Sequence, residues 1–541
     1  MANFRKWGTL RSDRVRSALY YARKNRLSKI NGGGGGGVTS IVVAEEIVAL
    51  TGGATEKDIT TINGIPISDF YQIYIHISKF THTSNGQLSL RLRRASDDTV
   101  MTTGYQNELF QGGGQQDWDV SGTQFRLGGS TNTSYFSLVL TGVGLEMPTT
   151  LEEDAIDGTT SVVGMYAPAE IINGLRVLMN GAGVFNGGAL HMVGLKLPQN
   201  QLKVTQYDYN VLSAANSFDH TFDVDTTQAL VVGDQIGVSA TGQFTYLQLG
   251  DGSIDTGSNY SRLYYANGLS HQISHTATAV RIRNNQLSQD RNSLFIQLMN
   301  LNSFAPVTIK SREIGGVNVA VGGHDLRVGA GVYNKGAIAE VNIMRIGIEG
   351  GVITHNEGVF YVLEIKAPNE ITSVSLNSGA QAVTIADGLT DVSLLHIVTS
   401  DLSLSASGRP GVQFTEGGLA LSGALDYTNA PLATNTEVGF TDDSSINTPQ
   451  SALWPVIFAS IFGLTKSANP QAQTIFMRDS AATGWDGGVN NGFVTQKTTH
   501  GTATPVSVPK VFDGVKLLDK AAVANFNGGT MHVVKYPSKA A

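Results

Sequence analysis

The chain has 541 residues, a net charge of -7 and only 15% charged residues, and it contains no cysteine. The lack of cysteine excludes disulfide bonds, thiolate metal sites and a thiol nucleophile. The 63 glycines, with many Thr, Ser, Asn and Val residues, favour short strands joined by tight turns. No apolar run reaches the ~18 residues that span a bilayer, and the N-terminus lacks the apolar core of a secretory signal. We therefore expect no membrane insertion and no secretion by the general route.

The first 31 residues differ in charge from the rest of the chain. They hold nine Lys and Arg residues against the single acid Asp13, a net charge of +8 that leaves -15 for the remainder. Residues 9–30 carry the one helical pattern, with Ser12 as N-cap, and the glycine run 32–37 follows as a flexible linker. We interpret this segment as a basic helix that docks on an acidic protein surface. Phosphate binding to nucleic acid and a solvated helix face stay open as alternatives. The docking candidates are Arg5, Arg11, Arg14, Arg16, Arg23 and Lys24.

From about residue 39 the apolar pattern has the two-residue period of strands. In residues 71–77, Tyr and Ile alternate with Gln, Tyr and His, and in residues 88–92 Leu alternates with Ser and Arg. This alternation predicts half-buried antiparallel strands, with one face on a core and the other in solvent. Residues 134–140 and 291–298 fit the central strands of two modules. The sequence therefore predicts an all-β fold of tandem antiparallel β-sandwich modules of jelly-roll type.

A segment that occurs three times divides the chain into modules. Residues 185–198 and 526–537 both begin Phe-Asn-Gly-Gly, and residues 356–368 fall in register with them. The third copy is two residues shorter before its Lys, an even deletion that keeps the same side chains on each face of a strand. Residues 174–178 and 514–518 are apolar and precede two of the copies. We therefore predict that each upstream strand pairs with the repeated segment in a closing hairpin, whose last strand stops at a Pro. The predicted divisions are 1–38 (basic helix and linker), 39–198, 204–368 and 369–541.

The repeated segment contains residue types that could form a site. His191 and His532 occupy equivalent positions and would suit a metal, but Tyr361 takes that position in the middle copy. We therefore interpret them as structural strand residues and predict no metal site. A lysine near the end of each closing strand is interpreted as protection of an exposed sheet edge. These lysines are Lys196, Lys366 and Lys535.

Acidic residues cluster in turn-rich stretches, but no cluster recurs with a partner. A glycosidase needs two acids that flank one cleft, and the chain has no Gly-x-Ser-x-Gly, His-Glu-x-x-His or Gly-Lys-Ser/Thr motif. Residues 251–255 resemble a calcium loop only faintly, because the remaining ligands are missing. We therefore predict a non-enzymatic protein without cofactors. The clusters are Asp97–Asp98, Asp117 with Asp119, Glu152–Asp154 and Asp442–Asp443.

Two tryptophans lie in polar stretches that we expect to be loops. Trp118 stands between two Asp residues, and Trp485 stands in Gly-Trp-Asp-Gly-Gly. An aromatic ring in a loop can stack on a sugar, although such rings more often pack on their own domain. We keep both tryptophans as candidate glycan contacts.

The pattern resembles bacteriophage virion structural proteins of the tail-fibre and head-fibre type. The shared features are a glycine tract, a Tyr-x-Ile-x-Ile strand, a Leu-x-Leu-x-Leu strand followed by Asp and Tyr, and Gly-Leu-Arg-Val-Leu before a Gly-Gly strand. In this chain they are residues 32–37, 71–75, 88–105 and 174–196. The resemblance covers the first module well and the ends of the other two modules fairly, and it leaves the N-terminal helix out.

The resemblance implies a non-enzymatic structural protein of the virion. Its N-terminus would dock on capsid, portal or tail proteins while the jelly-roll modules project outward, commonly as a homotrimer. Our leading hypothesis is a fibre or spike for host attachment, with host surface polysaccharide as a further partner. The alternatives are a particle-surface decoration or connector without a receptor role, and a polysaccharide depolymerase.

Overall fold

The computed structural model of the chain is built from mainly antiparallel β-sheets. Among the residues that it describes, the only helical segments are the 3-10 turns η1 (Ile67–Asp69) and η2 (Gln199–Gln201), and no helix is long and apolar enough to cross a bilayer. The predicted all-β, sandwich-like fold is therefore confirmed. The basic helix expected at residues 9–30 and the glycine linker lie outside the described residues. The structure describes residues 40–83, 87–111, 114–127, 134–155, 160–181, 183–208, 217–239, 243–266, 272–285, 292–314, 327–335, 340–349, 355–377, 379–386, 388–416, 419–420, 427–429, 433–435, 438–439, 451–462, 471–480, 484–494, 512–519 and 524–541.

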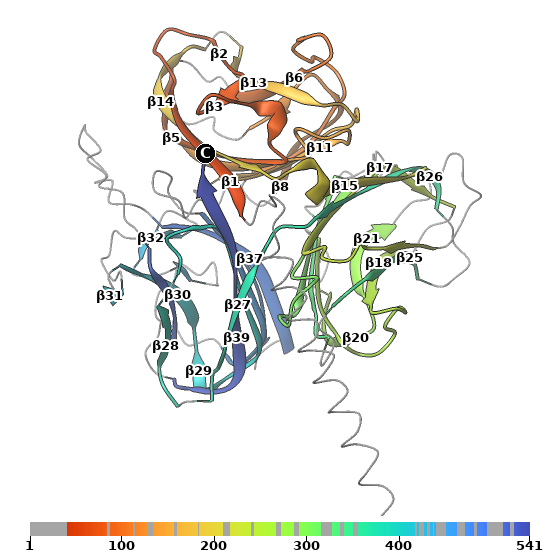
Figure 1. Ribbon diagram of the computed structural model, residues 1–541, viewed down its shortest axis with the longest axis vertical. Helices are drawn as coiled ribbons and strands as arrows, with labels where there is room; N and C mark the ends of the chain where they lie inside the picture. The colour runs from red at the N-terminus through yellow and green to blue at the C-terminus, as the bar shows by residue number, and fades with distance from the viewer. Residues whose placement is uncertain are drawn as a thin grey trace, which may run out of the picture. The chain divides into compact units, whose positions relative to one another are not determined.

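The first fourteen strands, here called module 1, form a larger and a smaller sheet that share one core (Figure 1). In sheet order, the larger sheet consists of β1 (Ile41–Ala49), β14 (Phe185–Lys196), β5 (Gln72–His82), β10 (Ser134–Thr141), β11 (Thr149–Ala155), β12 (Thr160–Tyr166), β7 (Tyr105–Gln111) and β8 (Gly114–Gly122). The smaller sheet consists of β2 (Glu56–Ile59), β13 (Ile172–Asn180), β6 (Gln87–Arg94) and β9 (Phe125–Arg126), and β3 (Thr61–Ile62) pairs with β4 (Ile65–Pro66).

Module 2 repeats this strand order. Its larger sheet consists of β15 (Leu202–Asp208), β26 (His355–Ile365), β17 (Gln228–Val238), β22 (Asn292–Met299), β23 (Val307–Ile314), β24 (Arg327–Tyr333), β19 (Tyr260–Ala266) and β20 (Gln272–Ala277). Its smaller sheet consists of β16 (Ser217–Thr221), β25 (Ile343–Ile348), β18 (Gln243–Gly250) and β21 (Val280–Asn285). The central strands expected at residues 134–140 and 291–298 correspond to β10 and β22.

Module 3 has the same arrangement again. Its larger sheet consists of β27 (Glu370–Ser375), β39 (Phe526–Ala540), β29 (Val392–Gly408), β35 (Ser451–Phe462), β36 (Gln471–Ser480), β37 (Gly484–Val494), β32 (Tyr427–Asn429) and β33 (Ala433–Asn435). Its smaller sheet consists of β28 (Ala382–Ala386), β38 (Gly514–Asp519), β30 (Pro410–Glu416) and β31 (Leu419–Ala420), with β34 (Val438–Gly439) beside β30. One strand order is therefore built three times by a single chain.

The last strand of the chain pairs with the first. Strand β1 runs parallel to β39, with Ile41 opposite Ser538 and Val43 opposite Ala540, so the larger sheets of modules 1 and 3 join into one 16-stranded sheet. The C-terminus accordingly lies beside β1 (Figure 1). The expectation that Pro537 ends the last strand is wrong, because β39 continues through it to Ala540.

The predicted closing hairpin is also wrong. Strand β13 pairs with β2 and β6 in the smaller sheet, whereas β14 pairs with β1 and β5 in the larger one. The glycine-containing connection therefore crosses from one sheet to the other, and the same holds between β25 and β26 and between β38 and β39. Two apolar strands joined by a short turn can pair with each other or cover the two faces of one core, and both arrangements give the same local pattern.

Candidate functional site

The repeated segment forms β14, β26 and β39, and one glycine fixes its register in each copy. Gly188, Gly358 and Gly529 have φ of 134°, 99° and 102°, a backbone region that suits glycine. Counted from these glycines, the third residue is His191, Tyr361 or His532, and the sixth is Gly194, Glu364 or Lys535. The predicted two-residue deletion is therefore wrong: the third strand keeps its length and carries its lysine two positions earlier.

The lysines of the repeat do not protect a sheet edge, because each repeated strand lies inside its sheet with a neighbour on both sides. They form ion pairs instead. Lys196 pairs with Asp69, and Lys366 Nζ lies 2.9 Å from Asp223 Oδ2. Lys535 Nζ lies 3.8 Å from a carboxylate oxygen of Glu370.

The second repeated motif, Leu-x-Leu followed by Asp and Tyr, holds the smaller sheet to the larger one. The hydroxyl of Tyr105 accepts a hydrogen bond from the backbone N–H of Leu92 at 2.7 Å. In module 2, the hydroxyl of Tyr260 accepts the same bond from Leu249 at 2.7 Å. Both rings are fully buried, so the motif is a structural tyrosine contact.

Two of the acidic stretches noted in the sequence, Asp97–Asp98 and the faint calcium loop, are engaged in ion pairs and turn contacts. Arg93 and Arg94 pair with Asp98 and Asp97 in the same turn. In the faint calcium loop, Asp255 accepts bonds from the N–H of Gly257, the amide of Asn259 and the hydroxyl of Tyr333, each within 2.7 to 2.8 Å. Burial would raise the pKa of Asp255, but these bonds outweigh it and lower the pKa. Across the described ranges, no group of three or more His, Asp or Glu side chains could hold a metal ion.

Neither candidate glycan contact lies in a loop. The backbone of Trp118 belongs to β8, opposite Glu108 of β7, and that of Trp485 belongs to β37, opposite Asp479 of β36. The two positions are not equivalent, because β37 corresponds to β12 in module 1 rather than to β8. The docking candidates between residues 5 and 24 lie outside the described residues, as do Asp442 and Asp443.

The larger sheets of all three modules contribute to one apolar cluster, here called the module junction. Along each repeated strand, side chains alternate between the core of their own module and this shared cluster. In module 1, for example, Leu190 and Met192 face the module core, whereas Val193 and Leu195 belong to the junction. The equivalent junction residues are Leu363 and Ile365 in module 2, and Val534 and Tyr536 in module 3.

The junction covers strand faces whose polar residues look solvent-exposed in the sequence. Gln72, Tyr74 and His76 of β5 are only 5%, 6% and 7% exposed, so β5 is buried on both faces and the half-buried prediction is wrong for it. Burial, reinforced by the nearby His191, lowers the pKa of His76 to about 3. The imidazole is therefore neutral at physiological pH.

Buried charges cross the junction between modules 1 and 2. Glu152 of β11 forms an ion pair with Lys310 of β23, and Arg312 Nε lies 3.8 Å from the same carboxylate oxygen. The amide of Gln106 also donates to Asp234 at 3.1 Å. Burial raises the pKa of Asp234, partly offset by this bond and one from a serine. These pairs fix the orientation of two modules, because a charge buried away from its partner is costly.

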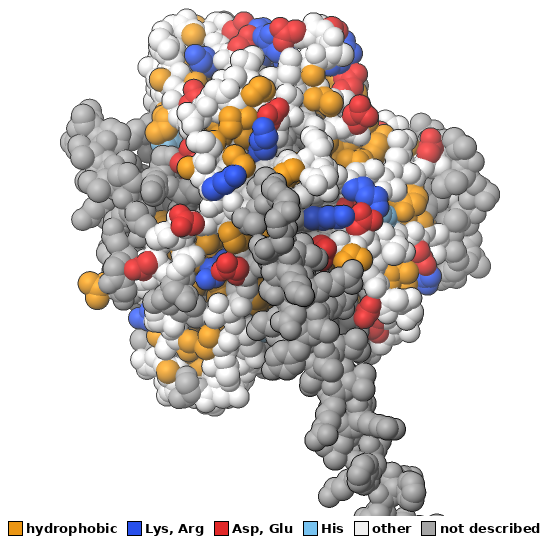
Figure 2. Space-filling model, in the orientation of Figure 1, with side chains coloured by type: hydrophobic (Ala, Val, Ile, Leu, Met, Phe, Trp, Pro, Cys, Tyr) orange, Lys and Arg blue, Asp and Glu red, His pale blue; other side chains and the backbone are white. Residues whose placement is uncertain are grey.

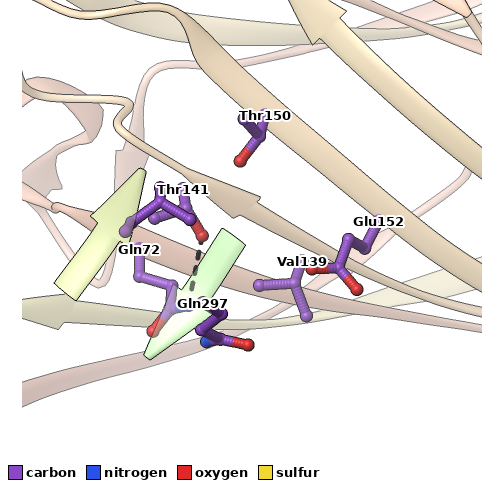
Figure 3. A pocket seen from close by; sticks show the side chains of 7 residues that line it. Gln72, Val139, Thr141, Thr150, Glu152 and Gln297 are labelled. Carbon is purple, nitrogen blue, oxygen red and sulfur yellow. Dashed lines mark hydrogen bonds between the residues drawn. The ribbon is translucent and has the colours of Figure 1, made fainter. Parts of the chain in front are cut away.

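A small cavity lies within this part of the junction (Figure 3). Gln72, Val139, Thr141, Thr150 and Glu152 line it from module 1, and Leu230 and Gln297 line it from module 2. The amide of Gln72 donates to the hydroxyl of Thr141 at 3.1 Å. Its volume of about 20 Å³ has room for one water molecule, so this cavity serves packing between modules rather than an organic ligand.

Asn300, directly after β22, organises the contact between modules 2 and 3. It is fully buried with a φ of 67°, in the left-handed region that asparagine adopts more readily than most residues other than glycine. Its side-chain oxygen lies 3.4 Å from Nδ1 of His396 and accepts from the hydroxyl of Tyr536 at 3.5 Å. Its backbone oxygen accepts from Lys335 at 3.0 Å, and burial lowers the pKa of this lysine to about 7.

The sequence pattern does not group the junction residues, but strand β23 carries a signal of the junction. Strand β23 carries the three charged residues Lys310, Arg312 and Glu313, and all eight of its residues are buried. Charged side chains in a buried strand indicate a partner that the strand's own module does not supply. Asn300 carried no comparable signal, because its role depends on backbone conformation.

Module 2 contains a polar cluster at a position where module 1 has apolar packing. Glu364, fully buried, accepts bonds from the N–H of Asp223 at 2.6 Å and the hydroxyl of Thr226 at 2.8 Å. His220 Nε2 lies 3.3 Å from the carboxylate and its Nδ1 lies 2.8 Å from the hydroxyl of Tyr207. Burial would raise the pKa of Glu364, but His220 and these bonds lower it. At the equivalent position of module 1, Gly194 leaves space for an aromatic ring, so the cluster replaces that ring contact.

The described surface carries charges of both signs. On the face shown in Figure 2, acidic and basic side chains lie next to each other and apolar side chains are scattered among polar ones. Arg176 pairs with Asp58 at 2.6 Å in module 1, and Arg345 pairs with Asp219 at 2.6 Å at the corresponding place in module 2. Such exposed pairs contribute at most ~1 kcal/mol each to stability and favour solubility.

The chain matches no model of a known protein family and no curated protein. Solved structures with some similarity include domains LG4-5 of the mouse laminin alpha1 chain, with 10% identity over 60% of this chain and 88% of that chain and a TM-score of 0.12. A tail fiber protein from an E. coli phage shows 9% identity over 60% of this chain and 40% of that chain, with a TM-score of 0.12. A structure of infectious bursal disease virus, Gt strain, shows 9% identity over 60% of this chain and 81% of that chain, with a TM-score of 0.10. At such TM-scores these similarities support no argument about this chain.

Proposed function

We propose that the chain is a structural component of a bacteriophage particle, a fibre or spike that docks through residues 1–38 and projects its β-sandwich modules. The observation that carries the proposal is the module junction, where three modules of one strand order share an apolar cluster. Apolar packing, buried ion pairs and strand pairing at the junction suit a scaffold that bears load. The basic charge of residues 1–31 supports docking on an acidic surface of capsid, portal or tail proteins.

Mass spectrometry of purified particles tests the proposal directly. We expect the chain in particles that survive density-gradient purification, and its absence would contradict the proposal. A variant that lacks residues 1–38 should fold normally, because β1 begins at Ile41. It should stay outside the particle, because it lacks the proposed docking segment. Reversing the charge of Arg11, Arg14 and Arg16 to Glu provides a version of this test without truncation.

The second candidate is a particle-surface decoration or connector without a receptor role. Deleting module 3 would not separate the two functions, because β39 pairs with β1 and supplies Val534 and Tyr536 to the junction. Single substitutions of Trp118 and Trp485 by Ala are better suited. Normal particle assembly with reduced adsorption to the host would support the fibre or spike role and a contact with surface polysaccharide. Normal assembly with unchanged adsorption of both variants would favour the decoration or connector.

We propose no enzymatic activity for the chain. The remaining alternative, a polysaccharide depolymerase, predicts new reducing ends when the purified protein is incubated with host capsule or lipopolysaccharide. We expect no increase over a heat-inactivated sample.

A further inference from the structure

Part of the outer face of each larger sheet packs against other modules of the same chain. Two equivalent positions from every module meet in the module junction: Val193, Leu363 and Val534 at the first, and Leu195, Ile365 and Tyr536 at the second. When equivalent positions of three similar bodies enter one cluster, each body uses the same surface toward the others. Cyclic homotrimers pack in this way, with one patch of every subunit at the centre.

Each pair of modules also has contacts of its own, so the three modules form a closed cycle. Modules 1 and 2 are joined by the ion pair between Glu152 and Lys310. Modules 2 and 3 are joined by a second apolar cluster, in which Met299 of module 2 packs with Val398 and Phe458 of module 3. Modules 3 and 1 are joined by the pairing of β39 with β1.

The pairing of the two chain ends closes this cycle without a covalent link. Val43 lies opposite Ala540, and the N–H of Ala541 donates to the backbone oxygen of Val43 at 2.9 Å. The other two pairs of modules are also connected covalently: η2 links modules 1 and 2, and the segment between β26 and β27 links modules 2 and 3. Modules 1 and 3 therefore adhere by non-covalent contacts alone.

We propose that the chain is a monomer in which three modules take the places of the three subunits of a cyclic trimer. The resemblance to phage tail-fibre and head-fibre proteins implies a homotrimer of whole chains. Here the sheet faces on which three copies would meet are already occupied inside each chain, and the partner of each face is another module of that chain. This inference concerns stoichiometry and does not depend on a role in a virus particle.

A protease site inserted between Gln199 and Asn200, both exposed, tests the inference on the full chain. Before cleavage, light scattering after size-exclusion chromatography should give the mass of one chain at micromolar concentration. After cleavage, module 1 should stay bound to the remainder and elute at the same volume. A mass of three chains before cleavage, or separation of the fragments after it, would overturn the inference.

Substitutions at the junction add a specific control. Glu152→Lys in the cleavable protein should release module 1 on cleavage, because it places a third positive charge beside Lys310 and Arg312. The double variant Glu152→Lys with Lys310→Glu should restore retention. Ile47→Asp, on a side chain of β1 that is 55% exposed, should leave retention unchanged. Release in the Ile47 variant, or no rescue in the double variant when circular dichroism shows both to be folded, would contradict the proposed contacts.

Discussion

Lowering the pH should reduce the free energy of unfolding through two buried histidines. His76 is 7% exposed and His396 is fully buried, and burial lowers the pKa of each from 6.5 to about 3. The unfolded chain therefore takes up a proton at each site below pH 6.5, whereas the folded chain does so only near pH 3. The stability that each neutral imidazole contributes is complete above pH 6.5 and is lost progressively as the pH falls toward 3.

The magnitude follows from the two pKa values of each histidine. Between pH 7.5 and 5.0, each site lowers the free energy of unfolding by about 2 kcal/mol, and the two together by about 4 kcal/mol. Domain stabilities are on the order of 5–15 kcal/mol, so this loss is readily measured. The substitution His396→Phe keeps a ring between Phe458 and Tyr536 and removes the titrating group.

Urea unfolding, followed by circular dichroism at both pH values, provides the assay. We expect the His396→Phe variant to lose about 2 kcal/mol less than the parent between pH 7.5 and 5.0. Tyr536→Phe is the matched control, because it removes a contact to the same Asn300 without changing a group that titrates in this range. It should shift stability equally at both pH values. An unchanged pH dependence in the His396 variant would refute the reasoning.

Two further substitutions probe packing and buried charge by the same unfolding assay. A Cβ at Gly194 would lie 2.6 Å from the ring of Phe70, so Gly194→Ala should lower the free energy of unfolding by about 1–3 kcal/mol. At the control position Gly187 the nearest atom would be 3.7 Å from the added Cβ, and Gly187→Ala should lower it by less than about 1 kcal/mol. Equal effects of the two substitutions would contradict the packing argument. Glu152→Gln should cost about 3 kcal/mol by weakening a buried ion pair, whereas Glu56→Gln, at a side chain 50% exposed, should cost at most about 1 kcal/mol. A cost below about 1 kcal/mol for the Glu152 variant would show that this pair does not hold the modules together.

The repeats were readable from the sequence because local geometry dictates them. The Phe-Asn-Gly-Gly segment recurs because its second glycine holds a positive φ where the strand bulges, and the Leu-x-Leu, Asp and Tyr motif recurs because a buried hydroxyl must meet a backbone N–H. The register of the lysines could not be read in the same way. Lys535 occupies the position of Gly194 and Glu364. Only the bulge glycine of each strand, six residues earlier, shows that the third copy has no deletion before its lysine.

The all-β class and the inner face of each sandwich follow from local sequence, because the two-residue alternation is a local property of the chain. What covers the other face depends on how the modules pack in three dimensions. Gln72 and Tyr74 have the pattern of a solvent face, yet they are buried because other modules approach them from distant parts of the sequence. Alternation separates two faces of a strand without stating the environment of either, so the module junction became visible only when all three modules were in place.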